Sequence, residues 1–354
     1  MLEEPPRLGY FVVSVSARTP SYLPGEKALG PRFRGDDEIG GMNLHLWIPQ
    51  SVLWTFAAIV ALLVVATAVV AWMRRGDASR HVELAARVRS WWILVFVFAI
   101  AISFRRVVAI GFFAVLSFLA LKEYLSLIPT RRADRRVLFW AYLCVPLQYV
   151  FIGMHWYNMF LIFIPVWAFL WIAMRMVLRG DTKDFLRAAG TIHWGLMTMV
   201  FGLSHLAYLL VLPDGKPVAA HGAALLLFVV LLTELNDVAQ YIWGKTLGRR
   251  KVIESVSPKK TIEGLIGGVG TTTLLSFLLA PFLTPLTRGD SIAVGLMIGF
   301  GGFLGDVTIS AVKRDIGVKD SGSLIPGHGG ILDRIDSLLF TGPLFFHFMA
   351  YFYF

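Results

Sequence analysis

The sequence predicts an all-α, polytopic integral membrane protein with about ten transmembrane helices. Of its 354 residues, 56% are hydrophobic and only 16% are charged, whereas a soluble domain carries about a quarter charged residues. Apolar runs of about 17–25 residues recur along the chain, and each could cross the roughly 30 Å hydrocarbon layer of a bilayer. Basic residues gather in the loops between these runs, as in the cytoplasmic loops of membrane proteins.

Residues 1–46 differ from the rest of the chain, because they are polar, contain several prolines and lack an apolar helical run. They also lack the charged region followed by an apolar core that marks a signal peptide. We expect this extension to be disordered, and Met42 is an alternative start of the chain. The transmembrane helices of the N-terminal part then occupy residues 47–233, and residues 234–354 form a membrane region that concentrates the polar motifs.

The expected spans follow the apolar runs in order. Their approximate limits are 47–72, 91–104, 107–127, 137–153, 157–176, 192–212, 218–235, 262–285, 292–312 and 338–354. A basic loop follows every odd-numbered span, and these loops begin near Arg74, Arg131, Arg175, Lys245 and Lys313. This alternation predicts that the first span enters from outside and that the basic loops face the cytoplasm.

Two arginines do not fit this alternation. Arg105 and Arg106 lie between two short apolar runs and would face outside. A broken or re-entrant helix over residues 91–127 is the alternative.

The net charge of +10 does not indicate nucleic-acid binding. The basic residues flank apolar spans, and the chain carries no nucleic-acid recognition motif. The single cysteine, Cys144, lies within an apolar run and has no partner for a disulfide or a metal site. We therefore expect it to be a packing residue.

The first polar cluster lies at the expected inner end of the span that closes near residue 235. Asn236 and Asp237 carry the oxygen atoms that Mg²⁺ prefers as ligands. A carboxylate at membrane depth is costly and usually functional. The alternative is a carboxylate at a helix end that simply reaches water.

The second cluster, residues 257–264, lies where a basic loop enters the next span. Ser257 and Pro258 are typical of a helix start. Exposed amides at a helix start, together with Lys259 and Lys260, would form a natural phosphate site. An ordinary capped helix with a basic flank remains the alternative.

The third cluster begins at Asp306 and carries the strongest signal. In a helix, Asp306, Ser310 and Lys313 share one face, because they are spaced at i, i+4 and i+7. That face would offer a metal ligand, a hydroxyl and a phosphate-binding cation in a row. Asp333 and Asp336 are expected to share a face at the start of the last span, where two carboxylates favour a shared Mg²⁺.

The run from Ser310 to Asp336 resembles the signature of the phosphatidate cytidylyltransferases, also called CDP-diacylglycerol synthases. The matching positions are Ser310, Lys313, Arg314, Lys319, Asp320, Pro326, Gly327, His328, Gly329, Gly330, Asp333, Arg334, Ile335 and Asp336. Residues 257–264 are similar to a second motif of that family, and Asp237 with Tyr241 is similar to a third. In the third motif Ala239 and Gln240 replace a Gly-Ala pair, which indicates a divergent branch.

The resemblance implies a catalytic region at residues 234–354 and a Mg²⁺-dependent reaction, in which phosphatidic acid attacks the α-phosphorus of CTP and pyrophosphate leaves. We expect the metal ligands to be Asp237, Asp306, Asp333 and Asp336. Catalytic roles are expected for Asp306, Asp333, Lys313, Arg314 and His328. Substrate contacts are expected from Ser257, Lys260, Ser310, Lys319, Gly329, Gly330 and Arg334.

The expected partners are CTP, a lipid phosphate and the surrounding membrane lipids, without nucleic acid, and a homodimer is kept open. The expected location is the cell membrane, with the active site on the cytoplasmic face, where polar CTP can meet a lipid. A cytidylyltransferase for another lipid phosphate, such as an isoprenoid-type lipid, would have a similar site. A transporter is disfavoured, because charge collects at one face and no internal repeat is evident.

Overall fold

The computed structural model describes residues 48–76, 82–129, 134–180, 182–215, 220–318, 321–322 and 330–354. Every regular element in these ranges is helical, apart from one isolated bridge between Lys251 and Thr261. The extension at residues 1–46 and the predicted site residues Lys319, His328 and Gly329 lie outside the described residues.

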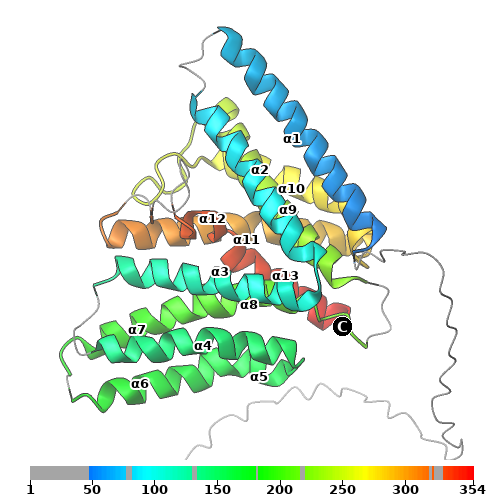
Figure 1. Ribbon diagram of the computed structural model, residues 1–354. Coiled ribbons are helices and arrows are strands. Elements are labelled where there is room, and N and C mark those ends of the chain that lie inside the picture. The colour runs from blue at the N-terminus through cyan, green and yellow to red at the C-terminus, as the bar shows by residue number, and fades with distance from the viewer. Residues whose placement is uncertain are drawn as a thin grey trace, which may run out of the picture. The chain divides into compact units, whose positions relative to one another are not determined.

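The helices follow the apolar runs (Figure 1). In chain order they are α1 (Gln50–Gly76), α2 (Val82–Ser103), α3 (Arg106–Leu127), α4 (Arg135–Gly153), α5 (Tyr157–Ile162), η2 (Phe163–Ala168), α6 (Phe169–Val177), α7 (Phe185–Gly195), η3 (Leu196–Gly202), α8 (Leu203–Tyr208), α9 (Gly222–Leu247), α10 (Ile262–Leu283), α11 (Arg288–Asp315), α12 (Leu332–Ile335) and α13 (Leu338–Phe352).

The predicted fold class, an all-α polytopic membrane protein, is confirmed. Within the described ranges, nine helical segments are long and apolar enough to cross a membrane. The fifth of these joins α5, η2 and α6, and the ninth joins α12 and α13. The remaining predicted span, at 192–212, corresponds to α7, η3 and α8, where a π-helical turn interrupts the α-helix.

Helix α9 continues well beyond residue 235, where the sequence suggested its end. Tertiary hydrogen bonds explain the extension, because they satisfy polar side chains inside the bundle. The Asn236 side chain is buried, donates to the carbonyl oxygen of Gly299 at 3.2 Å and accepts from Thr272 Oγ1 at 3.0 Å. Asp237 therefore lies within a helix that is held against both α10 and α11.

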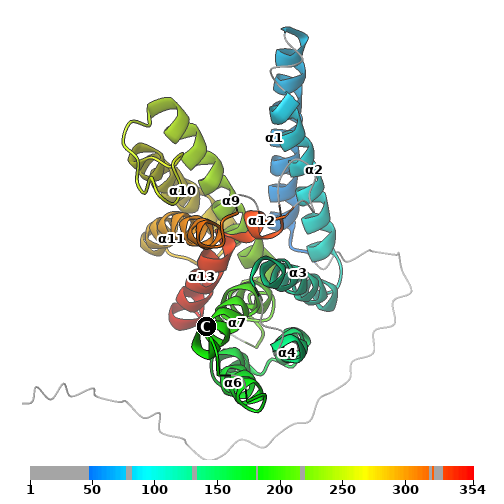
Figure 2. The ribbon, with the colours of Figure 1, turned by 90° about the vertical axis from the view of Figure 1, so that its left-hand side faces the viewer.

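Helices α9, α10 and α11 pack closely because glycines line their contacts. A Cβ atom at Gly299 of α11 would lie 2.9 Å from the Cα of Val269 on α10. Similarly, a Cβ at Gly295 would lie 2.6 Å from the Cα of Thr273. Small residues let membrane helices approach each other at backbone distance. Helices α9, α10 and α11 therefore lie side by side (Figures 1 and 2).

Ion pairs and hydrogen bonds join segments that the predicted alternation assigns to the same, outer side. Arg106 and His155 both contact Asp214, so loops that were expected outside meet at one end. Tyr353 and Asp290 join two further segments of that group. Residues 91–127 belong to two full-length helices with a break at residues 104–105, and not to one re-entrant helix.

Candidate active site

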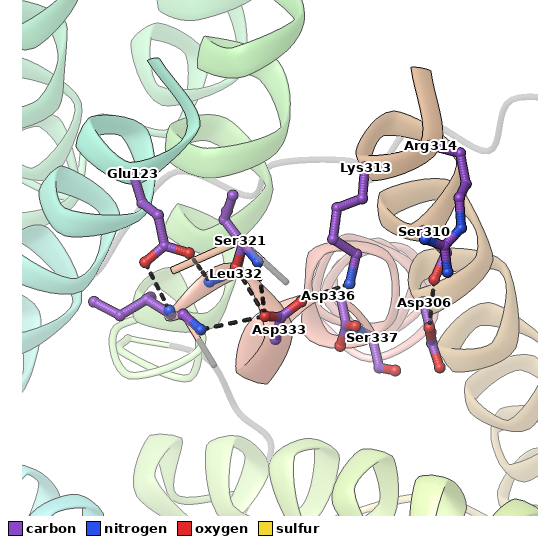
Figure 3. A network of polar contacts seen from close by, with 12 residues as sticks. Glu123, Asp306, Ser310, Lys313, Arg314, Ser321, Leu332, Asp333, Asp336 and Ser337 are labelled. Carbon is purple, nitrogen blue, oxygen red and sulfur yellow. Dashed lines mark hydrogen bonds and ion pairs between the residues drawn. The ribbon is translucent and has the colours of Figure 1, made fainter. Parts of the chain in front are cut away.

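The polar residues of the third cluster gather where α11 ends and α12 begins (Figure 3), and Lys260 and Asp237 of the other two clusters contact this group. On α11, the Ser310 hydroxyl donates to Asp306 Oδ1 at 3.2 Å, so these residues share a helix face as predicted. One turn further, Lys313 Nζ lies 2.5 Å from Asp333 Oδ1. The end of α11 thus presents a carboxylate, a hydroxyl and an ammonium group toward neighbouring elements.

The second motif contributes a lysine to this group. Lys260 Nζ lies 2.5 Å from Asp306 Oδ2 and 4.9 Å from the centroid of the Phe303 ring. Two backbone hydrogen bonds between the ends of the preceding loop place this lysine, one from Val252 N to Lys260 O and one from Ile262 N to Arg250 O. The carboxylate of Glu263 accepts from Arg249 N at 2.9 Å and fixes the start of the same loop.

The helix start predicted at Ser257 and Pro258 is wrong. Helix α10 begins at Ile262, and Thr261 is its N-cap, with Thr261 Oγ1 accepting from Gly264 N at 3.1 Å. The bridge between Lys251 and Thr261 keeps the chain extended until that point, so the cap forms later than expected. Ser257 instead lies in the loop, where its carbonyl accepts from Lys260 N.

Asp333 uses both of its carboxylate oxygens. Oδ1 receives Lys313, and Oδ2 accepts from Ser321 N at 3.1 Å, Ser321 Oγ at 3.0 Å and Gly330 N at 3.2 Å. The residue therefore ties together two pieces of the signature and the end of α11.

Asp237 and Asp336 belong to a second set of contacts. Ser337 Oγ donates to Asp237 Oδ2 at 2.8 Å, and Ser337 N donates to Asp336 Oδ1 at 2.9 Å. Asp237 Oδ1 is buried and has no hydrogen-bond partner. Asp237, Asp306 and Asp336 lie within electrostatic interaction range of one another. Asp333 and Asp336 have different hydrogen-bond partners, although the backbone stays in the right-handed helical region through Asp336 and Ser337.

Binding of Mg²⁺ by these acids stays a prediction. Oxygen ligands suit that ion, and three neighbouring carboxylates with one unpartnered oxygen supply them. In the described part of the chain, no three His, Cys, Asp or Glu side chains are arranged so that they could hold a metal ion. Lys260 and Lys313 instead pair with two of the acids. Joint ligation of one cation by Asp333 and Asp336 stays a prediction.

The two predicted arginines lie at the edge of this group. Arg314 Nε donates to the carbonyl oxygen of Val256 at 3.3 Å and so holds α11 against the loop that carries Lys260. Arg334 lies within electrostatic interaction range of Glu234 on α9.

The sequence reasoning missed Glu123, a buried acid of α3. Its Oε2 accepts from Ile331 N at 2.8 Å, and its Oε1 accepts from Leu332 N at 3.1 Å (Figure 3). The signal was available, because a carboxylate inside an apolar run is costly and calls for a reason. Gly330, for which a substrate contact was expected, faces this side chain, and a Cβ there would collide with Glu123 Oε1.

Comparison with known proteins places these residues in context. Residues 85–352 match the model of the cytidylyltransferase family. The chain is 48% identical over 298 residues to uncharacterized protein YnbB of Escherichia coli (strain K12), a match that covers 84% of this chain and 98% of that protein.

Two phosphatidate cytidylyltransferases match over shorter stretches. The protein from Synechocystis sp. is 52% identical over 115 residues, which is 32% of this chain and 39% of that protein. The protein from Haemophilus influenzae is 45% identical over 139 residues, which is 38% of this chain and 47% of that protein. Each match therefore spans less than half of the relative's length.

Proposed function

The chain belongs to the cytidylyltransferase family and is a nucleotidyltransferase of the membrane, and from this premise we propose that it transfers the cytidylyl group of CTP to phosphatidic acid. The products are CDP-diacylglycerol and pyrophosphate. The observation that carries this proposal is the meeting of three carboxylates, from Asp237, Asp306 and Asp336, with Lys260 and Lys313 beside the membrane-embedded helices.

The reaction needs no covalent intermediate on the protein. A phosphate oxygen of the lipid forms a bond to the α-phosphorus of CTP, and the bond from that phosphorus to the oxygen leading to the β-phosphate breaks. Pyrophosphate carries the electron pair away. Such transfers depend on positioning and on neutralising the phosphate charge, and the residues around Asp306 supply both kinds of group.

Each charged residue has a proposed role. Lys260 and Lys313 bind phosphate oxygens when substrate displaces them from Asp306 and Asp333, because an ammonium group binds phosphate as a point charge. Asp237, Asp306 and Asp336 would hold Mg²⁺, and the contacts of Asp333 place Lys313. When bound, Mg²⁺ neutralises charge on the transferring and leaving phosphates. Ser310 and Ser257 offer hydroxyls to phosphate oxygens.

The site is also accessible to one water-soluble substrate and one membrane-bound substrate. It lies at helix ends, next to the polar loop at 248–261, while the helices that carry it are long and apolar enough to span a bilayer. CTP reaches such a site from water and the lipid reaches it from the bilayer. From the basic loops we infer that this end faces the cytoplasm at the cell membrane.

The test is purified protein in detergent, with CTP, Mg²⁺ and phosphatidic acid, followed by mass spectrometry of the lipids and an assay for pyrophosphate. We expect CDP-diacylglycerol and pyrophosphate in equal amounts, and neither product when the lipid is left out. A parallel reaction replaces phosphatidic acid with an isoprenoid phosphate. If product forms only in that reaction, the lipid substrate is another lipid phosphate. Folded protein that is inactive with both lipids would refute the proposal.

A further inference from the structure

Glu123 lies on α3, in the N-terminal half of the chain, yet its carboxylate binds the segment that carries Asp333 and Asp336. We propose that Glu123 is a positioning residue for nucleotidyl transfer, which it serves by fixing the first turn of α12. The inference rests on the proposed function and deepens it, since it extends the catalytic machinery to a helix outside the recognised motifs.

Both oxygens of the Glu123 carboxylate take part in this contact. Glu123 is only 6% exposed, and its two oxygens accept from Ile331 N and Leu332 N, at 2.8 Å and 3.1 Å. A buried charge is costly unless hydrogen bonds compensate it. Two backbone amides do so here, because the carboxylate accepts a hydrogen bond from each of them.

The backbone next to Glu123 leaves space for its side chain. A Cβ at Gly322 would lie 3.3 Å from Glu123 Cδ and Oε2, and a Cβ at Gly330 would overlap Oε1. Both glycines flank the segment that leads into α12, and each leaves the carboxylate room that a larger residue would fill. The close approach of Gly330 is therefore explained by Glu123.

Hydrogen bonds link the contact between Glu123 and α12 to the candidate active site. Gly330 N, directly before the amides bound by Glu123, donates to Asp333 Oδ2, whose other oxygen receives Lys313. Asp336 follows one turn later and interacts with Asp306. A shift of α12 would displace these groups together. A displacement of about 1 Å can cost roughly 10²-fold in rate.

The experiment compares Glu123→Gln with a matched control on the same helix. Glutamine keeps the size of the side chain, but its NH₂ group cannot accept a hydrogen bond from the second backbone amide. The control is Ser117→Ala, which removes the buried hydrogen bond from α3 to Tyr149 Oη without touching α12. Hydrogen–deuterium exchange in detergent follows the amides of Ile331 and Leu332, and steady-state kinetics follows CTP and phosphatidic acid.

We expect faster exchange at Ile331 and Leu332 in Glu123→Gln only. We also expect kcat to fall about 10-fold or more, with the KM for CTP within about twofold and the thermal midpoint close to that of Ser117→Ala. Gly330→Ala should lower kcat similarly, and the double variant should be no worse than the single ones, because both changes break one contact.

The outcomes separate the two proposals. Unchanged exchange, a normal kcat in Glu123→Gln, or an equal loss of kcat in Ser117→Ala would overturn the role of Glu123. Wild-type protein without activity toward any lipid phosphate would instead overturn the proposed function. In that case exchange still decides the anchoring of α12, since unchanged exchange rejects it and faster exchange supports it.

Discussion

Lys260 and Asp306 form an ion pair, with Nζ 2.5 Å from Oδ2, that joins the loop before α10 to the start of the third cluster on α11. Neither residue is close to the other in the sequence. The pair shows that the second and third clusters, which the sequence presents separately, contribute to one group of charged side chains. It also defines a cation that an incoming phosphate can recruit.

Lys260→Met should weaken CTP binding more than it slows the chemical step. The change removes the ammonium group but keeps a flexible apolar chain over Phe303. We expect the KM for CTP to rise about tenfold, because one charge-assisted contact to phosphate is lost. Lys260→Arg should recover part of the affinity, since it restores the charge. Steady-state kinetics would show this, and an unchanged KM in Lys260→Met would place Lys260 outside the nucleotide site.

Asp306→Asn should lower kcat by a factor of about 10² or more, because it removes a charge that a clamping divalent ion needs. The fold should survive, since asparagine has the same size and can still accept the hydrogen bond from Ser310. A thermal unfolding scan in detergent provides the control. Near-normal turnover at saturating Mg²⁺ would remove Asp306 from the set of metal ligands.

Comparison of Asp237→Asn with Asp333→Asn should separate metal binding from positioning. Asp237 has an unpartnered oxygen, whereas both oxygens of Asp333 already accept hydrogen bonds or contact Lys313. We expect Asp237→Asn to raise the Mg²⁺ concentration needed for half-maximal rate. Asp333→Asn should lower kcat with little change in that concentration. The reverse pattern in a Mg²⁺ titration would make Asp333 the metal ligand.

The orientation can be tested by cysteine labelling in a Cys144→Ala background. Cysteine at position 251 should resist a membrane-impermeant reagent applied to intact cells, and cysteine at position 216 should react. The prediction follows from the basic loops after odd-numbered spans, and the contacts of Asp214 with Arg106 and His155 group the opposite loops at the other end. Labelling at position 251 from outside would contradict the predicted orientation.

Hydrophobicity and charge in the sequence were enough to predict the helical class and the approximate spans. The grouping of Asp306 with Ser310 was also predictable, because it depends only on helical spacing. The end of α9 was not predictable, since Asn236 is stabilised inside the bundle by Thr272 and Gly299. Tertiary hydrogen bonds of this kind have no local pattern.

The role of Glu123 needed the structure for a similar reason. Its position in an apolar run marked it as unusual, but its partners, Ile331 and Leu332, lie more than two hundred residues later in the chain. The cap of α10 at Thr261 depended on the bridge to Lys251, which the sequence did not reveal. Contacts without a recognisable local sequence pattern thus account for these differences.

The fate of isotopic label in CTP tests the central claim most directly. Purified protein is given phosphatidic acid with CTP labelled at either the α- or the γ-phosphorus. Transfer of the cytidylyl group predicts that α-label enters the lipid fraction and that γ-label appears only in pyrophosphate. Label from the γ-phosphorus in the lipid would mean phosphoryl transfer, and no label in the lipid from either position would mean no transfer. Either result would contradict this account.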